Sequence, residues 1–329
     1  MFRPFARLTS VAAVGAVLLV GCGSGSGGST PSTPKGQLVA GVTALGDADV
    51  LTTTLKLDTT ADALQALASS SGDTLSSDTA AAIVGAQLVI ETQSGKDKAF
   101  SVRAVDAGQT LFELRVVSSN LYLQGDLRAI LKLAHRESAL ADVQAQVSQM
   151  PDFVRAFVAG DWVSLDGTAL AGLAGSLGAP TGSASPAQGP KMIAELKRIL
   201  SKDVTVRDAG KEGRGEHLVL TGNTRALAQD IAQSFVTSVP GGAAFSDKLK
   251  TSDVPSRPIT VDAWVKDGAL SQISVDLAQF ADKADVPAGT TLPITLTFEQ
   301  SGDDISAPGG ATPVDLTQLG GLIGGLTSA

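Results

Sequence analysis

Few side chains in this sequence could carry out chemistry. The 329 residues include only two histidines, His135 and His217, and a single cysteine. His135 stands beside Arg136 and Glu137 near the expected end of a helix, and His217 stands at the start of an expected strand. We therefore interpret both histidines as surface or helix-cap residues. No nucleophile elbow, zinc-protease, redox or phosphate-loop motif accompanies them. We predict no catalytic residue, no metal site and no cofactor.

Paired acids and tryptophans are the other candidates for a site. Asp47 with Asp49, and Asp303 with Asp304, lack the further ligands and the closing glutamate of a calcium-binding loop, so we interpret them as turn residues. Two carboxylates that meet in space could still hydrolyse a glycoside, but no particular pair is indicated. Two tryptophans in expected strands are more typical of packing than of a ligand site, namely Trp162 and Trp264.

The composition excludes several classes of protein. Hydrophobic residues make up 43% of the chain and charged residues 18%, and this apolar fraction can support a packed core, which argues against overall disorder. Acidic residues outnumber Lys and Arg by 33 to 25, so a basic nucleic-acid-binding surface is not expected. A lone cysteine has no partner for a disulfide within the chain.

The cysteine closes an N-terminal targeting pattern. Two arginines precede an apolar run of about ten residues, Val11 to Val20, which is shorter than the roughly 20 residues of a transmembrane helix and typical of a signal peptide. The run ends in the letters LVGC at 19–22, which resemble a bacterial lipobox. In that motif the thiol receives a diacylglyceryl group, and the signal is cut before the cysteine. An ordinary secretory signal that contains a cysteine by chance is the alternative.

These features predict the organisation of the chain. We expect a lipoprotein signal peptide at 1–21, lipidation at Cys22 and a location on the extracytoplasmic face of the cell membrane. The Gly/Ser/Pro/Thr tract from Gly23 to Gly36 has linker composition, and we predict a flexible tether at 22–45. A single domain follows at 46–329, with a mobile low-complexity insertion at about 168–189. Residues 1–21 hold two arginines and no acid, so their removal changes the net charge from −8 to −10.

Apolar periodicity predicts an α+β fold. Helical patterns are expected at about 61–68, 127–133, 138–149 and 151–158. Strand patterns are expected at 50–57, 82–91, 99–105, 110–117, 121–124, 161–166, 204–207, 216–221, 259–266, 269–277 and 292–299. Short turn signals between consecutive strands, above all Asp267-Gly268, indicate antiparallel pairing. We predict a curved antiparallel half-barrel sheet with helices packed on its concave face.

The order of these elements resembles the LolA-like fold and, within it, the actinobacterial LppX/LprAFG lipoproteins. The matching pieces, beside the lipobox and tether, are LYLQGD at 121–126, DWVSLD at 161–166, VDAWVKDG at 261–268 and ITLTFEQSGDDISAPGGA at 294–311. The likeness covers roughly residues 45–315. Members of that family are not enzymes, and their sheet and helices enclose an apolar cavity for the acyl chains of lipids or lipoproteins. The resemblance therefore implies a non-catalytic, membrane-anchored protein that binds or carries a lipid or acyl chain.

The apolar face of the predicted sheet has two interpretations. Packed against helices it would be a core, and held apart from them it would be a lipid pocket, and periodicity does not distinguish the two. On the second interpretation the ligand-binding residues are Phe112, Leu114, Val116, Val261, Val265, Ile294, Leu296 and Phe298. The alternative function is a structural or interaction lipoprotein that docks an envelope protein and has no cavity. A cell-surface hydrolase is a third hypothesis. In each case we expect a monomer.

Overall fold

The computed structural model describes residues 33–70, 72–95, 98–134, 136–167, 198–200, 202, 204–227, 229–230, 256–280, 289–315 and 318. They divide into two compact units, each built from two stretches of chain. Unit 1 takes its residues from Met1–Val84 and Gly182–Gly302, and unit 2 from Gly85–Thr181 and Asp303–Ala329. The predicted signal peptide, Cys22, the insertion at 168–189 and His135 lie outside the described residues, and the single domain at 46–329 stays a prediction.

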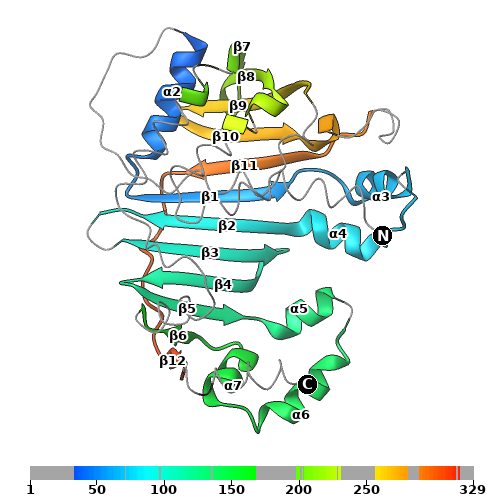
Figure 1. Ribbon diagram of the computed structural model, residues 1–329, viewed down its shortest axis with the longest axis vertical. Coiled ribbons are helices and arrows are strands. Elements are labelled where there is room, and N and C mark those ends of the chain that lie inside the picture. Colours follow the sequence, from blue (N-terminus) through cyan, green and yellow to red (C-terminus); the bar gives the residue numbers. More distant parts are fainter. Residues whose placement is uncertain are drawn as a thin grey trace. The chain divides into compact units, whose positions relative to one another are not determined.

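Unit 1 contains six strands that pair in antiparallel fashion (Figure 1). Its neighbours run in the order β1-β11-β10-β9-β8-β7, and every pair is antiparallel. The bounds are β1 Val50–Leu57, β7 Val204–Glu212, β8 Gly215–Asn223, β9 Pro258–Lys266, β10 Ala269–Asp276 and β11 Pro293–Glu299. Asp267 and Gly268 both have positive φ in the β9–β10 turn, as the Asp-Gly hairpin signal predicts.

Helix α2, Pro34–Leu45, corrects the predicted tether, whose second half is not flexible linker. Thr33 caps the helix by accepting a hydrogen bond from the Gly36 N–H at 3.1 Å, and Pro34 occupies its first turn. Leu38, Val42 and Leu45 follow at helical spacing and are all buried. The linker composition of the preceding tract hid this apolar stripe, and packing on the sheet stabilises a helix that is only weakly amphipathic.

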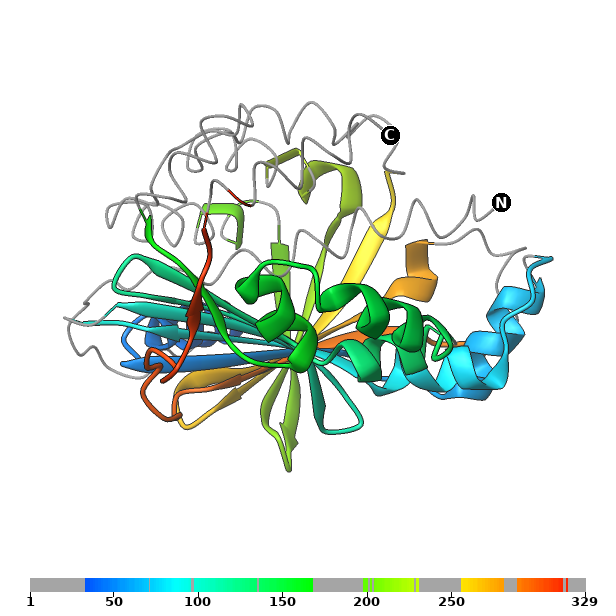
Figure 2. The same ribbon diagram turned by 90° about the horizontal axis from the view of Figure 1, so that it is seen from below.

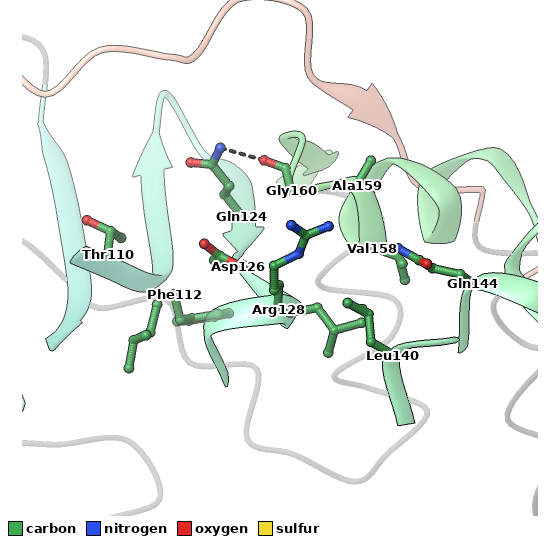
Figure 3. A pocket seen from close by; sticks show the side chains of 13 residues that line it. Thr110, Phe112, Gln124, Asp126, Arg128, Leu140, Gln144, Val158, Ala159 and Gly160 are labelled. Carbon is green, nitrogen blue, oxygen red and sulfur yellow. Dashed lines mark hydrogen bonds between the residues drawn. The ribbon is translucent and has the colours of Figure 1, made fainter. Parts of the chain in front are cut away.

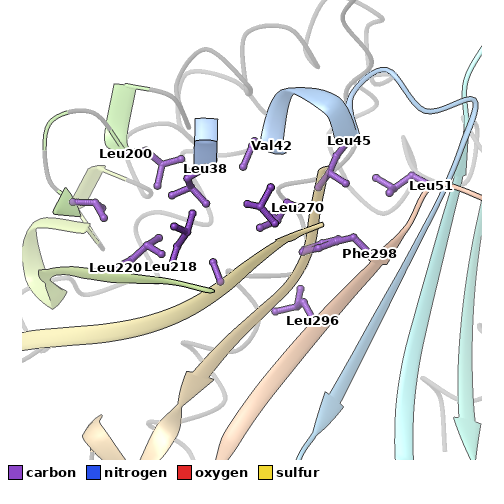
Figure 4. Close-up of a cluster of buried hydrophobic side chains, with 13 residues drawn as sticks. Leu38, Val42, Leu45, Leu51, Leu200, Leu218, Leu220, Leu270, Leu296 and Phe298 are labelled. Carbon is purple, nitrogen blue, oxygen red and sulfur yellow. The ribbon is translucent and has the colours of Figure 1, made fainter. Parts of the chain in front are cut away.

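The main core of unit 1 lies between α2 and the sheet (Figure 4). An ideal Cβ on Gly41 would lie 3.0 Å from the backbone nitrogen of Leu270, so glycine lets the helix approach β10 closely. The core joins side chains of α2 to the apolar face of the strands, and its buried members are Leu38, Val42, Leu45, Leu51, Leu200, Val204, Leu218, Leu220, Ala263, Val265, Leu270, Leu296 and Phe298.

A second, smaller cluster lies around the other helices of unit 1. Helix α3 is Ala61–Ser70, α4 is Ser77–Gly85, and a 3₁₀ turn, η2, follows β10 at Leu277–Phe280. Leu64, Leu67, Ala80 and Leu292 are the buried residues of this cluster. The predicted strand at 82–91 is wrong in its first part, because α4 continues to Gly85 and β2 begins at Ala86. Ser76 Oγ accepts from the Thr79 N–H at 3.2 Å and starts the helix that the apolar run had concealed.

The strands of unit 2 are paired in the order β12-β6-β5-β4-β3-β2. All pairs are antiparallel except β12 with β6. The bounds are β2 Ala86–Gln93, β3 Ala99–Asp106, β4 Gln109–Val117, β5 Asn120–Gly125, β6 Val163–Leu165 and β12 Thr312–Pro313. Three helices connect β5 to β6, namely α5 Leu127–Leu133, α6 Ala139–Val147 and α7 Asp152–Ala159. They lie side by side, in green, in Figure 2. Both units thus have the α+β composition and the antiparallel pairing that the sequence predicted.

One face of the unit 2 sheet carries polar side chains that are not all exposed to solvent. Period-two alternation predicts that Glu113 faces water, whereas Glu113 is only 6% exposed. Arg115 donates to its carboxylate at 2.6 Å, and Ser101 lies 3.4 Å from the same oxygen. The C-terminal stretch contributes to this face, since Arg115 also donates to the Ser306 carbonyl at 3.2 Å. Within the described part of the chain, no helix is long and apolar enough to cross a membrane.

Candidate functional site

Unit 2 contains a pocket of about 590 Å³ where β4 and β5 meet helices α5 to α7 (Figure 3). This volume falls within the roughly 300–1,000 Å³ of small-molecule sites. Its lining mixes apolar and polar side chains with one acid and one base. The lining residues are Thr110, Leu111, Phe112, Gln124, Gly125, Asp126, Leu127, Arg128, Leu140, Gln144, Val158, Ala159 and Gly160.

The end of α7 is fixed to β5 on one side of the pocket. Gln124 Nε2 donates to the Gly160 carbonyl at 2.7 Å, a bond drawn in Figure 3. Gly160 has a φ of 87°, the left-handed conformation that ends a helix, and its N–H bonds back to Phe157 at 3.0 Å. An ideal Cβ on Gly125 would lie 2.9 Å from Phe157 Cζ, so the phenyl ring packs directly on the strand backbone. These contacts hold this wall of the pocket in place.

Asp126 fixes the start of α5 on another side. Its Oδ1 accepts from the Ala129 N–H at 2.9 Å, which makes it the N-cap of the helix. Its Oδ2 accepts from Gln109 Nε2 at 2.7 Å, and its own N–H donates to the Leu111 carbonyl at 2.9 Å. The LYLQGD segment thus forms a strand, a close packing point and a helix cap in succession. Both carboxylate oxygens of Asp126 are occupied by these structural contacts.

The structure separates the eight predicted ligand-binding residues into two groups. In unit 1, Val265, Leu296 and Phe298 are buried in the core beneath α2, and Val261 and Ile294 pack against it. In unit 2, three lie on one face of β4 and remain only partly buried, namely Phe112, Leu114 and Val116. Phe112 lines the pocket. A ligand-binding role for these eight residues stays a prediction. Because the pocket lies in unit 2, the prediction now concerns the residues of unit 2 above all.

His217 is not the surface histidine that the sequence suggested, because its side chain is only 16% exposed. Nδ1 lies 2.9 Å from Glu212 Oε1, and Nε2 lies 2.8 Å from Asp262 Oδ1. The imidazole stacks on Trp264 with ring centroids 4.7 Å apart and planes 7° from parallel. The β8–β9 register places His217 opposite Trp264, a long-range pairing that the sequence alone does not reveal. Because carboxylates only accept, both contacts are hydrogen bonds when both ring nitrogens carry a proton.

Glu212 completes this cluster at the β7–β8 hairpin. The indole N–H of Trp264 donates to Glu212 Oε2 at 3.0 Å. That bond is the largest cause that lowers the pKa of Glu212 below its usual 4.5. Desolvation, the next largest cause, opposes it, and the charge and hydrogen bond of His217 and the charge of Arg214 lower the pKa further. Arg214 lies over the same indole ring, 5.2 Å from its centroid. The contacts of Glu212 and Arg214 with Trp264 hold the β7–β8 hairpin to β9. The cluster therefore stabilises the sheet.

The other candidate tryptophan, Trp162, also has a structural contact. Trp162 packs under the Arg115 guanidinium at 4.8 Å, a cation–π contact on the polar face of unit 2. Across the described ranges, no group of three or more His, Cys, Asp or Glu side chains is arranged to hold a metal ion. The polar lining of the pocket was not singled out from the sequence as a site. The only signal that could have found it was the LYLQGD segment, where a strand ends directly in a helix cap.

Comparisons with known proteins found a likeness to solved structures but no match in sequence. No protein-family model matches the chain, and no curated protein matches it in sequence. Among solved structures, the chain is similar to the crystal structure of the Mycobacterium tuberculosis lipoprotein LppX, over 83% of this chain and 97% of that one. The identity is 12% and the TM-score 0.33. This neighbour comes from the group of lipoproteins that the sequence patterns resemble, and at this TM-score the likeness assigns no function to the chain.

Proposed function

We propose that this protein is a non-catalytic lipoprotein of the cell envelope that binds an acyl chain in the pocket of unit 2. The observation that carries the proposal is the pocket itself, at about 590 Å³, with Phe112, Leu140 and Val158 among its apolar lining. Burial of methylene groups supplies about 0.8 kcal/mol each, so a single chain provides useful affinity without any residue chemistry.

The contrast between the two units supports this assignment. In unit 1 the apolar sheet face is covered by α2 and forms a core of buried side chains. In unit 2 the corresponding face of β4 stays partly exposed, and the neighbouring helices α5 and α6 have no buried residue among those described. Apolar side chains that remain accessible beside a pocket favour a ligand that covers them.

A pair of charge-matched variants tests acyl binding. Leu140 lines the pocket from α6, while Ala141, its neighbour, is exposed and does not. Leu140→Glu places a carboxylate among the methylene groups of a bound chain and is expected to weaken binding of a fluorescent acyl probe at least tenfold. Ala141→Glu adds the same charge to the same helix and should bind like wild type.

Acyl binding is measured by probe titration and by native mass spectrometry of the purified protein, which also reads the expected monomer. Melting temperatures of both variants establish that they remain folded. A wild-type protein that neither co-purifies with lipid nor binds the probe would refute the proposed function.

Anchoring through Cys22 is the second part of the proposal, and the lipobox pattern at 19–22 supports it. Two acyl chains on one residue hold stably to a membrane, where one chain would be marginal. Cys22→Ala is expected to release the protein from the membrane fraction or to leave the signal uncleaved, as read by fractionation and intact mass. Continued membrane retention of a cleaved Cys22→Ala protein would show that the anchor is elsewhere.

A further inference from the structure

The pocket contains one charged group whose role the fold does not explain. Of its two charged lining residues, Asp126 uses both carboxylate oxygens as a helix cap and as the acceptor for Gln109. Arg128, on the first turn of α5, has an exposed side chain, and no hydrogen bond or ion pair joins it to any residue in the part of the chain that the structure describes. No ion pair links Arg128 to Asp126, although the two are close in sequence.

Arg128 lies where it can contact a ligand in the pocket. Figure 3 shows the Arg128 side chain among the lining residues, between Asp126, which directly follows β5, and Val158 on α7. Gln144 of α6 also lines the pocket and adds an amide. A guanidinium offers five N–H donors in a planar fork that matches a carboxylate or phosphate group. The apolar part of the lining, with Leu111, Phe112 and Leu140, suits a hydrocarbon chain.

We propose that the pocket takes an acyl lipid with an anionic head group, a carboxylate or a phosphate, and that Arg128 binds this head group. This inference rests on the proposed function and narrows its ligand class. The apolar part of the mixed lining contacts the hydrocarbon chain, and Arg128 discriminates between anionic and uncharged head groups. Because Arg128 is exposed, water weakens its interaction, and we expect discrimination of about tenfold, at the lower end for hydrogen bonds to charged groups.

Three dodecyl probes with different head groups test the proposal. The mature chain, residues 22–329 with Cys22→Ser so that no lipid is attached, contains every described residue. Calorimetric titration with dodecanoate, dodecyl phosphate and monododecanoyl glycerol, each kept monomeric, should give about tenfold tighter binding of the two anionic probes. Arg128→Gln should abolish this preference while leaving the affinity for the uncharged glyceride unchanged. Arg128→Lys should keep part of the preference.

A control variant and the possible outcomes distinguish a failure of the role of Arg128 from a failure of the proposed acyl-binding function. Arg155 on α7 is exposed, pairs with Asp152 and does not line the pocket, so Arg155→Gln removes the same charge and should keep the wild-type preference. An unchanged preference in Arg128→Gln, or equal wild-type affinity for all three probes, would overturn the role of Arg128 and leave acyl binding intact. Binding of none of the probes would overturn the proposed function as well. Binding of inorganic phosphate as tightly as dodecyl phosphate would show a simple anion site.

Discussion

Replacing Leu38 by alanine is expected to lower the free energy of unfolding of unit 1 by about 2–5 kcal/mol. Leu38 is 2% exposed and lies in the middle of α2, where it joins the core that the helix shares with the sheet. Truncation removes buried methyl groups and leaves a cavity that a helix fixed through Gly41 against β10 cannot easily close. Urea unfolding followed by circular dichroism measures the loss.

The same variant decides between a docked helix and a flexible tether. Gln37→Ala changes the adjacent, partly buried residue and should alter stability by no more than about 0.5 kcal/mol. A Leu38→Ala effect as small as that of Gln37→Ala would mean that α2 does not dock in solution. Docking also bears on the proposed anchor, since Thr33 lies eleven positions after Cys22 and the chain between them spans at most ~40 Å when fully extended. Unit 1 would then stay within that distance of the lipidated residue.

Replacing Gly215 by alanine is expected to lower stability by about 3 kcal/mol or more. Gly215 has a φ of +127°, and an added Cβ would overlap the Val265 carbonyl oxygen, which belongs to the neighbouring strand β9. Either the left-handed backbone or the β8–β9 pairing must give way. The residue also begins the strand that carries His217, so loss of the close approach disturbs the stack on Trp264.

Gly210 provides the matched control for this variant. It lies in the same hairpin with a φ of +103°, but an added Cβ meets nothing within 4 Å. Gly210→Ala should therefore cost only the backbone strain, about 1–2 kcal/mol. Unfolding titrations of both variants, together with the tryptophan fluorescence of the folded proteins, separate strain from overlap. Equal losses for the two variants would contradict the close approach of β8 to β9.

Local patterns predicted much of the fold because they report on the period of burial along each segment. The alternation in 259–266 and 292–299 identified β9 and β11, and Asp267-Gly268 identified the turn after β9. The apolar run at 82–91 misled, since a short apolar run suits a helix end and a strand equally well. The stripe Leu38, Val42 and Leu45 was missed because it directly follows a tract of linker composition.

The candidate site was less accessible from sequence, because its residues meet only through long-range register. Phe112 was predicted from its alternation on β4, whereas Gln124 and Gly160 become neighbours only when α7 folds back onto β5. His217 and Asp262 are 45 positions apart and meet because β8 pairs with β9. Neither residue carries a signal in its own neighbourhood that points to the other.

From its residues alone this chain could be assigned an N-terminal lipobox-like pattern, an acidic body and an α+β order of elements, since each depends on composition or on spacing within one segment. Folding in three dimensions was needed to show which apolar face is closed and which stays open. The same period-two pattern gives a packed core in unit 1, where α2 covers it, and a partly exposed face in unit 2, where a pocket remains. Alternation records which side chains share a face, and the elements packed against that face decide whether it is a core or a binding site.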